Sequence, residues 1–200
     1  MICSREEKET MLCEISLYLG NNFFLTWFLL SIIAFVCLMI LSSLIFYEYY
    51  VKISYEKWLK KSNPKYPSVE NVRQEILLMM RGIFSGTFCP SLTLYLMSKE
   101  KLKGYCGLND YGWIYLITSF FISWLFVDFF EFVYHRLGHC YRSLWKYHKS
   151  HHQFYNPTPF SVIAEDYLDQ IIGASPLFIV PVVVPINIDL LFFQVISLKR

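Results

Sequence analysis

Long uncharged apolar stretches alternate with polar segments along the chain. Residues 23–47, FFLTWFLLSIIAFVCLMILSSLIFY, carry no charge. About 20 apolar residues in succession are needed to cross the hydrocarbon core of a bilayer, so this stretch is predicted to span a membrane. A cleaved signal peptide is not expected, because its apolar region has only about 7–15 residues and the first 22 residues mix acids with bases.

Three further apolar stretches follow the first. Residues 76–97 contain Arg81, two glycines and Pro90, which predicts a span that is broken, short or buried against neighbouring helices. Residues 113–135 acquire acidic residues only near their end and form the third predicted span. Residues 171–196 contain three prolines, so a kinked or hairpin-like insertion is expected instead of a straight helix.

The polar segments give the predicted spans a direction. Residues 48–74 are basic and aromatic with two prolines, as in a loop or interfacial helix at the lipid headgroups. If the first three stretches cross, the side with this loop and the histidines has ten Lys and Arg, and the opposite side has five. The positive-inside rule then places the histidines in the cytosol. The sequence predicts an all-α integral membrane protein of three to four transmembrane helices, with a cytosolic helical cap that carries the histidines.

Composition excludes several other classes of protein. Of the 200 residues, 55% are hydrophobic, which is more than a soluble core needs. The net charge is +2, and no arginine-rich arm or phosphate-binding glycine loop is present, so nucleic acid is excluded as a partner. The six cysteines are dispersed. Neither a disulfide framework nor a zinc-binding CxxC pattern is predicted, and most cysteines are expected to be reduced.

Every histidine of the chain lies within residues 135–152, HRLGHCYRSLWKYHKSHH. His135 and His139 are four residues apart, so on a continuing helix they share one face. Asp128 and Glu131 precede His135 by seven and four residues, which places two carboxylates on that face. The candidate metal ligands are His135, His139, His148, His151 and His152.

The ligand type narrows the choice of metal only in part, because neutral imidazole binds zinc, copper, iron and nickel. A zinc hydrolase of the HExxH type needs a glutamate where this chain has Arg136. A closed structural zinc site has four ligands, usually with cysteine, whereas five imidazoles offer nitrogen for two metals. Two irons can share the oxidation steps that split O2. Two other interpretations stay open: histidines in a basic loop at lipid headgroups need have no function, and Asp128 and Glu131 can be ordinary solvated or ion-paired acids.

HRLGH at 135–139 and HKSHH at 148–152 resemble the first two histidine boxes of the fatty acid hydroxylase/sterol desaturase superfamily. These integral membrane di-iron oxidases have the pattern HxxxH, HxxHH and a later HxxHH. The run DFFEFVYHRLGH resembles the family's approach to its first box, and NPTPF at 156–160 is similar to the PTPF of the sterol C5-desaturase (lathosterol oxidase) branch. The resemblance covers residues 113–195. It divides the chain into a polar N-terminal segment (1–22), membrane spans with an interfacial loop (23–112), a partial family domain (113–195) and an atypical C-terminal end (196–200).

The resemblance implies a membrane oxidase that hydroxylates or desaturates a sterol or fatty-acyl lipid, with sterol C5 desaturation as the first expectation. Two iron ions held by the five histidines would use O2 and two electrons, delivered from NAD(P)H through a reductase and a b-type cytochrome. The protein would lie in the endoplasmic reticulum membrane, with its boxes facing the cytosol and its substrate entering sideways from the bilayer. Acids such as Asp128 or Glu131 would orient ligand imidazoles. No catalytic residue, exact substrate or oligomeric state is indicated.

Two departures from the family pattern leave alternatives. Asp166 stands where relatives commonly place another histidine, with Glu165 and Asp169 as neighbours; it is either a substitute ligand or part of a solvated acidic loop. No third HxxHH follows before FFQVISLKR, so the alternative function is a truncated, catalytically inactive membrane isoform that acts as partner or regulator of a full-length enzyme. A metal transporter with histidines at its channel mouth is a third possibility. It would need polar residues along the spans, and the first span offers only Thr26, Ser31, Ser42 and Ser43.

Overall fold

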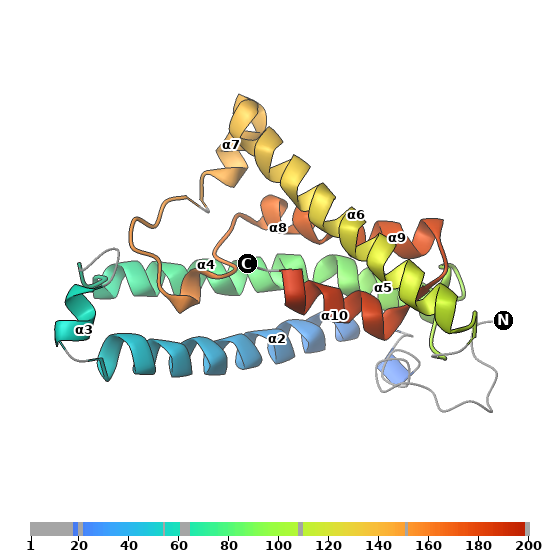
Figure 1. Ribbon diagram of the computed structural model, residues 1–200, viewed down its shortest axis with the longest axis horizontal. Helices are drawn as coiled ribbons and strands as arrows, with labels where there is room; N and C mark the ends of the chain where they lie inside the picture. Colours follow the sequence, from blue (N-terminus) through green and yellow to red (C-terminus); the bar gives the residue numbers. More distant parts are fainter. Residues whose placement is uncertain are drawn as a thin grey trace.

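The computed structural model describes residues 18–19, 22–53, 55–60, 65–107, 110–150 and 152–198, and this part of the chain is mostly helical (Figure 1). The long helices are α2 (Phe23–Phe46) with its π-helical continuation η1 (Tyr47–Val51), α4 (Val69–Gly86), α5 (Phe88–Ser98) and α6 (Trp113–Cys140). The shorter elements are α3 (Tyr55–Leu59), β1 (Gly104–Tyr105), α7 (Arg142–His148), η2 (Pro159–Ser161), α8 (Tyr167–Ala174), α9 (Pro176–Val183), β2 (Ile186–Asn187) and α10 (Ile188–Leu198).

Three segments of the described residues are long and apolar enough to cross a membrane: Phe23–Val51, Val69–Ser98 and Trp113–Cys140. They confirm the predicted all-α membrane fold, and the apolar segment Tyr167–Val183 is shorter. The second span is the most enclosed, since 44% of its most apolar stretch is buried, against 11% and 17% in the other two. It is also interrupted at Thr87, between α4 and α5, as expected from its glycines and proline.

The first two spans run side by side in opposite directions (Figure 1). Apolar side chains of α4 pack together with Phe160 against α2. Polar contacts cross the same interface: the Trp27 indole donates to the Phe84 carbonyl at 2.8 Å, and the Ser31 and Thr87 hydroxyls lie 2.7 Å apart. Because lipid satisfies no polar groups, such pairs fix the register of the two helices.

The chain after α9 returns to the start of the third span. β1 pairs with β2 in parallel, with Gly104 opposite Ile186, and α10 then lies beside α6 (Figure 1). The side-chain amide of Gln194 donates to the Phe120 carbonyl and the Ser123 hydroxyl, both at 2.8 Å. The succession of α9, β2 and α10 agrees with the kinked or hairpin-like course expected from the prolines.

One cysteine departs from the expectation of reduced thiols. Cys37, Cys89 and Cys140 are free, whereas Cys106, buried just after β1, is disulfide-bonded. Cys3 and Cys13 lie outside the described residues. Cys106 precedes the start of α6 and the histidines lie at and beyond its other end, so the disulfide and the histidines mark opposite ends of the third span.

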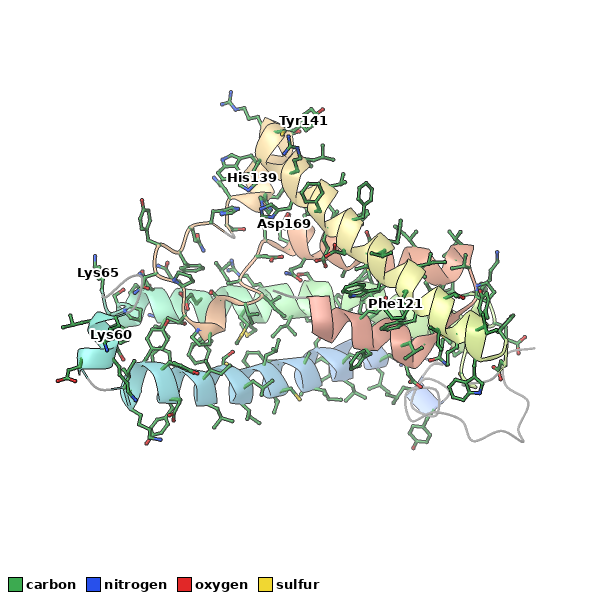
Figure 2. The ribbon with its side chains drawn as sticks, viewed as in Figure 1. Lys60, Lys65, Phe121, His139, Tyr141 and Asp169 are labelled. Carbon is green, nitrogen blue, oxygen red and sulfur yellow. The ribbon has the colours of Figure 1, made fainter. Side chains whose placement is uncertain are left out.

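The polar segment between the first two spans is short-helical and aromatic, as expected of an interfacial segment. The rings of Tyr50, Trp58 and Tyr66 pack together, with centroids 5.2–6.3 Å apart. Lys60 and Lys65 are exposed at the same corner of the molecule (Figure 2). Aromatic rings beside exposed cations are the composition that a membrane interface favours.

Candidate metal centre

The end of α6 presents the first two histidines. Because α6 continues to Cys140, His135 and His139 lie one turn apart on one face, as predicted, and their Nε2 atoms are 3.2 Å apart. The chain then turns at Tyr141, which has an extended backbone (φ −109°, ψ 122°), and α7 packs back on α6. This reversal brings the ring centroid of His148 to 4.5 Å from that of His135.

Gly138 is the residue that permits this close return of the chain. It is buried, and a Cβ atom at this position would lie 2.9 Å from Cγ of the His148 ring. A side chain there would therefore collide with the imidazole. The glycine of HRLGH thus has a packing role between the two groups of histidines.

Four imidazoles converge at the end of α6, where Figure 2 labels His139. The ligand nitrogens of His135, His139, His148 and His152 all lie within 4.8 Å of one another. Nε2 of His152 is 3.3 Å from Nε2 of His148. His151 lies outside the described residues. The structure therefore brings together four of the five side chains that the sequence singled out.

The cluster is enclosed on one side and open on the other. His148 is only 4% exposed, whereas the other three imidazoles are exposed. Trp145 of α7 covers part of the open side: its ring stacks on His152 with centroids 5.8 Å apart and lies 5.3 Å from His139. Solvent and small solutes thus reach the cluster past one indole ring.

The segment that carries the histidines is basic. Its exposed cations are Arg136, Arg142, Lys146 and Lys149. A hydrogen bond to the Tyr147 hydroxyl raises the pKa of the Lys146 amine, so this group stays charged at neutral pH. Exposed positive charge of this kind attracts anionic lipid headgroups and acidic protein surfaces.

A buried carboxylate contacts the enclosed side of the cluster. Asp169 of α8 is 3% exposed, and its Oδ2 lies 3.0 Å from Nδ1 of His148. The hydroxyl of Tyr134 donates to Oδ1 of the same carboxylate, and Figure 2 shows Asp169 beside the histidines. The sequence named Asp169 only as a neighbour of Asp166. No periodic signal marks it, because it lies 21 residues after His148 on another helix.

The other acids considered from the sequence have different surroundings. Asp166 is the N-cap of α8, and its side chain accepts from the backbone N–H of Leu168 at 3.1 Å. Asp128 is exposed and Glu131 is half-buried. Among the described residues, none of these three belongs to the group of side chains that share a possible ion site.

The NPTPF motif (residues 156–160) fastens the chain after the last histidine to the first two spans. Thr158 donates through its backbone N–H, at 3.2 Å, and through its hydroxyl to the Glu75 carboxylate of α4. Glu75 is fully buried. The Pro159 carbonyl accepts from the Ser42 hydroxyl of α2 at 3.0 Å. The segment that follows His152 is thereby fixed to both α2 and α4. This gives the motif a structural role that its sequence alone did not reveal.

The donor set fits a transition-metal ion. Neutral imidazole suits zinc, copper, iron and nickel. Nitrogen ligands about 2.1 Å from one ion lie roughly 3–4 Å from each other, and the His135–His139 and His148–His152 separations of 3.2 and 3.3 Å fall in this range. No two of the four nitrogens are more than 4.8 Å apart, so the four described imidazoles are close enough to contribute to one metal site.

Comparison with known proteins identifies relatives. Residues 120–199 match the sequence model of the family described as fatty acid hydroxylase. The Delta(7)-sterol 5(6)-desaturase erg3C of Aspergillus fumigatus is 31% identical over 141 residues, which cover 64% of this chain and 43% of that protein. The lathosterol oxidase of Rattus norvegicus is 31% identical over 156 residues, or 74% of this chain and 50% of that protein. The Delta(7)-sterol-C5(6)-desaturase of Nicotiana tabacum is 27% identical over 136 residues, covering 64% and 50%.

No solved structure gives a significant match. The chain spans about half the length of the curated relatives it matches. The matched region contains both groups of histidines, the return of α7 onto α6 and the NPTPF motif. Residues 120–199 of this chain therefore belong to the fatty acid hydroxylase family.

Proposed function

We propose that this chain forms part of a membrane-bound oxidoreductase that uses O2 to modify a lipid, with sterol C5(6) desaturation as the specific reaction. The observation that carries the proposal is the convergence of four imidazole nitrogens within 4.8 Å at the end of an apolar helix long enough to span a membrane. The names of the relatives, which are sterol C5(6)-desaturases and lathosterol oxidases, support a sterol as the substrate class.

The proposed cofactor is a pair of iron ions. The four clustered imidazoles would hold one ion through neutral nitrogens, and the second would need His151 and donors beyond the described residues. Bound iron supplies the redox chemistry by which O2 is activated. The protein's own part is to keep the ligand nitrogens unprotonated and in place. For His148, the Asp169 carboxylate holds the ring proton at Nδ1, which leaves Nε2 free to bind a metal.

The proposed reaction needs electrons from outside. Desaturation removes two hydrogen atoms from adjacent carbons, which supplies two of the four electrons and two of the four protons that convert O2 into two waters. The other two electrons are proposed to come from NAD(P)H through a reductase and a b-type cytochrome, and the other two protons from water. The exposed cations of the histidine-bearing segment fit the acidic surface of a redox partner.

The membrane-facing side of α6 offers a route for an apolar substrate. Phe121, Leu125 and Phe132 are 54%, 59% and 61% exposed, and Figure 2 shows Phe121 part-way along α6. By helical spacing they lie toward the same side as His135. A lipid that moves along this surface reaches the imidazoles without entering water, so we propose lateral entry from the bilayer.

We also propose that the protein lies in the endoplasmic reticulum membrane with its histidines in the cytosol. Two independent features support this orientation. Lys and Arg are concentrated at the histidine end, as expected for the cytosolic side. Cys106, at the other end of the third span, is disulfide-bonded, and disulfides persist in the oxidising lumen but are rare in the cytosol.

Metal analysis of the chain, purified in detergent without chelators, tests the cofactor. Iron is expected in the purified protein, and His148→Ala is expected to lose most of it because the enclosed ligand is removed. Zinc as the sole metal, or an unchanged iron content in His148→Ala, would contradict the proposal.

Sterol profiling tests the substrate. In cells that lack their own sterol C5(6)-desaturase, the chain is expected to lower the accumulated Delta(7)-sterol, and its His139→Ala variant is not. Unchanged sterols together with altered hydroxylated lipids would instead assign a hydroxylase acting on another lipid.

A further inference from the structure

Asp169 lies between the two helices that carry the clustered histidines. Its Oδ2 receives the Nδ1–H of His148, at the end of α7, at 3.0 Å. Its Oδ1 receives the hydroxyl of Tyr134, which directly precedes His135 on α6. Both oxygens of one buried carboxylate are therefore engaged, each by a group attached to a different part of the cluster.

The first contact selects which nitrogen of His148 faces the cluster. A neutral imidazole has one N–H and one lone pair, and a carboxylate can only accept, so Nδ1 must carry the hydrogen. The lone pair is then on Nε2, which is the atom that lies 3.3 Å from Nε2 of His152. The alternative tautomer would present a hydrogen where a metal ligand is needed.

The second contact fixes the distance between α6 and α8. Tyr134 is half-buried, and its hydroxyl reaches across to α8. That helix in turn packs closely on α4, since a Cβ at Gly86 of α4 would lie 2.9 Å from the Gln170 side chain. Asp169 thus connects the cluster to the helix that packs on the second membrane span.

We propose that Asp169 is a positioning residue for the metal centre, which holds His148 in its metal-binding tautomer and, through Tyr134, holds α6 and α7 at the separation that one ion requires. This inference rests on the proposed function, because it assumes that the four imidazoles bind a metal. Carboxylates that hold ligand histidines typically contribute about 10–100-fold to metal affinity.

The test is a titration of the full chain, purified without metal in detergent, with Co2+ as a coloured probe. Asp169→Asn is expected to bind Co2+ about 10–100-fold more weakly than the unmodified chain and to change the shape of the Co2+ absorption bands. Tyr134→Phe keeps the carboxylate and is expected to weaken binding by a smaller factor.

Asp166→Asn is the matched control. It removes the same charge three residues away, and asparagine is as good an N-cap as aspartate, so the affinity for Co2+ is expected to stay within about twofold. An equal loss in Asp166→Asn and Asp169→Asn would show that only local charge matters and would overturn the proposal. So would unchanged affinity and bands in Asp169→Asn.

The loss of metal binding altogether and the loss of the Asp169 contact give different results in this titration. If the unmodified chain binds no Co2+, the metal-centre premise of the proposed function is wrong and the positioning role falls with it. If the unmodified chain binds Co2+ but Asp169→Asn fails to fold, Tyr134→Phe decides: unchanged affinity and bands overturn the cross-link, and weaker binding with native helicity supports it.

Discussion

At Gly138 the two histidine-bearing helices approach each other closely, because a Cβ there would lie 2.9 Å from the His148 ring. We expect Gly138→Ala to displace His148, to destabilise the protein by about 1–3 kcal/mol and to lower the bound metal. Thermal unfolding in detergent and the metal content per chain measure both effects.

Gly173→Ala is the matched control for that change. Gly173 also lies within a helix, α8, but nothing is within 4 Å of a Cβ at this position, so metal content and stability are expected to be retained. Similar metal contents in Gly138→Ala and the unmodified chain would show that the close approach is not required.

Thr158 is the second residue at which the loss of one hydroxyl group has a large expected effect. Thr158→Val keeps the shape of the side chain but removes the hydroxyl that donates to the fully buried Glu75. The backbone N–H of residue 158 still donates to Glu75, so the carboxylate loses one of its two donor groups at a cost of about 1–3 kcal/mol, and the midpoint of thermal unfolding is expected to fall accordingly.

Thr118→Val serves as the reference for Thr158→Val. The Thr118 hydroxyl is exposed and donates to the Ile114 carbonyl within α6, so its removal is expected to change stability by less than about 0.5 kcal/mol. Equal effects of the two substitutions would show that the NPTPF motif does not hold the segment that follows His152 in place.

At the scale of elements, α8 and the turn before it determine where the histidine cluster lies relative to the membrane helices. A Cβ at Gly82 of α4 would lie 2.1 Å from the backbone carbonyl of Ile163. Gly82→Ala is therefore expected to push the 158–166 segment off α4 and to release metal, as measured by metal content after purification.

Gly86→Ala is the comparison for that experiment, because it adds a Cβ to the same face of α4 where the nearest atom belongs to a flexible side chain. The closest atom to a Cβ at Gly86 is the end of the Gln170 side chain, at 2.9 Å, which can rotate away. A milder loss of metal is expected. If Gly82→Ala retains its metal as well as Gly86→Ala does, the docking of this segment does not control the centre.

Sequence periodicity predicted those parts of the site that a single helix carries. His135 and His139 lie four apart on a long apolar helix, and the regular geometry of that helix placed them together. The return of α7 depends on Tyr141 leaving the helical region of backbone space and on the absence of a side chain at Gly138. Neither feature produces a repeating pattern, so the convergence of the second group with the first required the structure.

Polar contacts between residues far apart in the sequence could not be predicted from the periodicity of the sequence either. Asp128 and Glu131 were expected to orient ligand imidazoles because they share the helical face of His135. The carboxylate that contacts a ring nitrogen of His148 is instead Asp169. Thr158 and Glu75 are 83 residues apart. Such pairs form only because particular helices pack against each other, and no repeat in the sequence indicates them.

For the molecule as a whole, the direction of insertion can be tested with one thiol. Cys140 is free and exposed at the histidine end. In sealed microsomes with the cytosolic face outward, a membrane-impermeant maleimide is expected to label it without detergent, and Cys140→Ser removes that portion of the label. Labelling of Cys140 only after permeabilisation would place the histidines in the lumen and reverse the proposed topology.

His148 is enclosed while its three partner imidazoles face the outside, and this asymmetry bears on how an ion arrives and departs. An incoming ion is expected to bind the three exposed imidazoles first, and to be held most tightly once His148 also binds it. Departure follows the reverse path, so soluble chelators have access to the ion at every stage. Buffers that contain EDTA are therefore expected to strip the purified protein of metal without unfolding it.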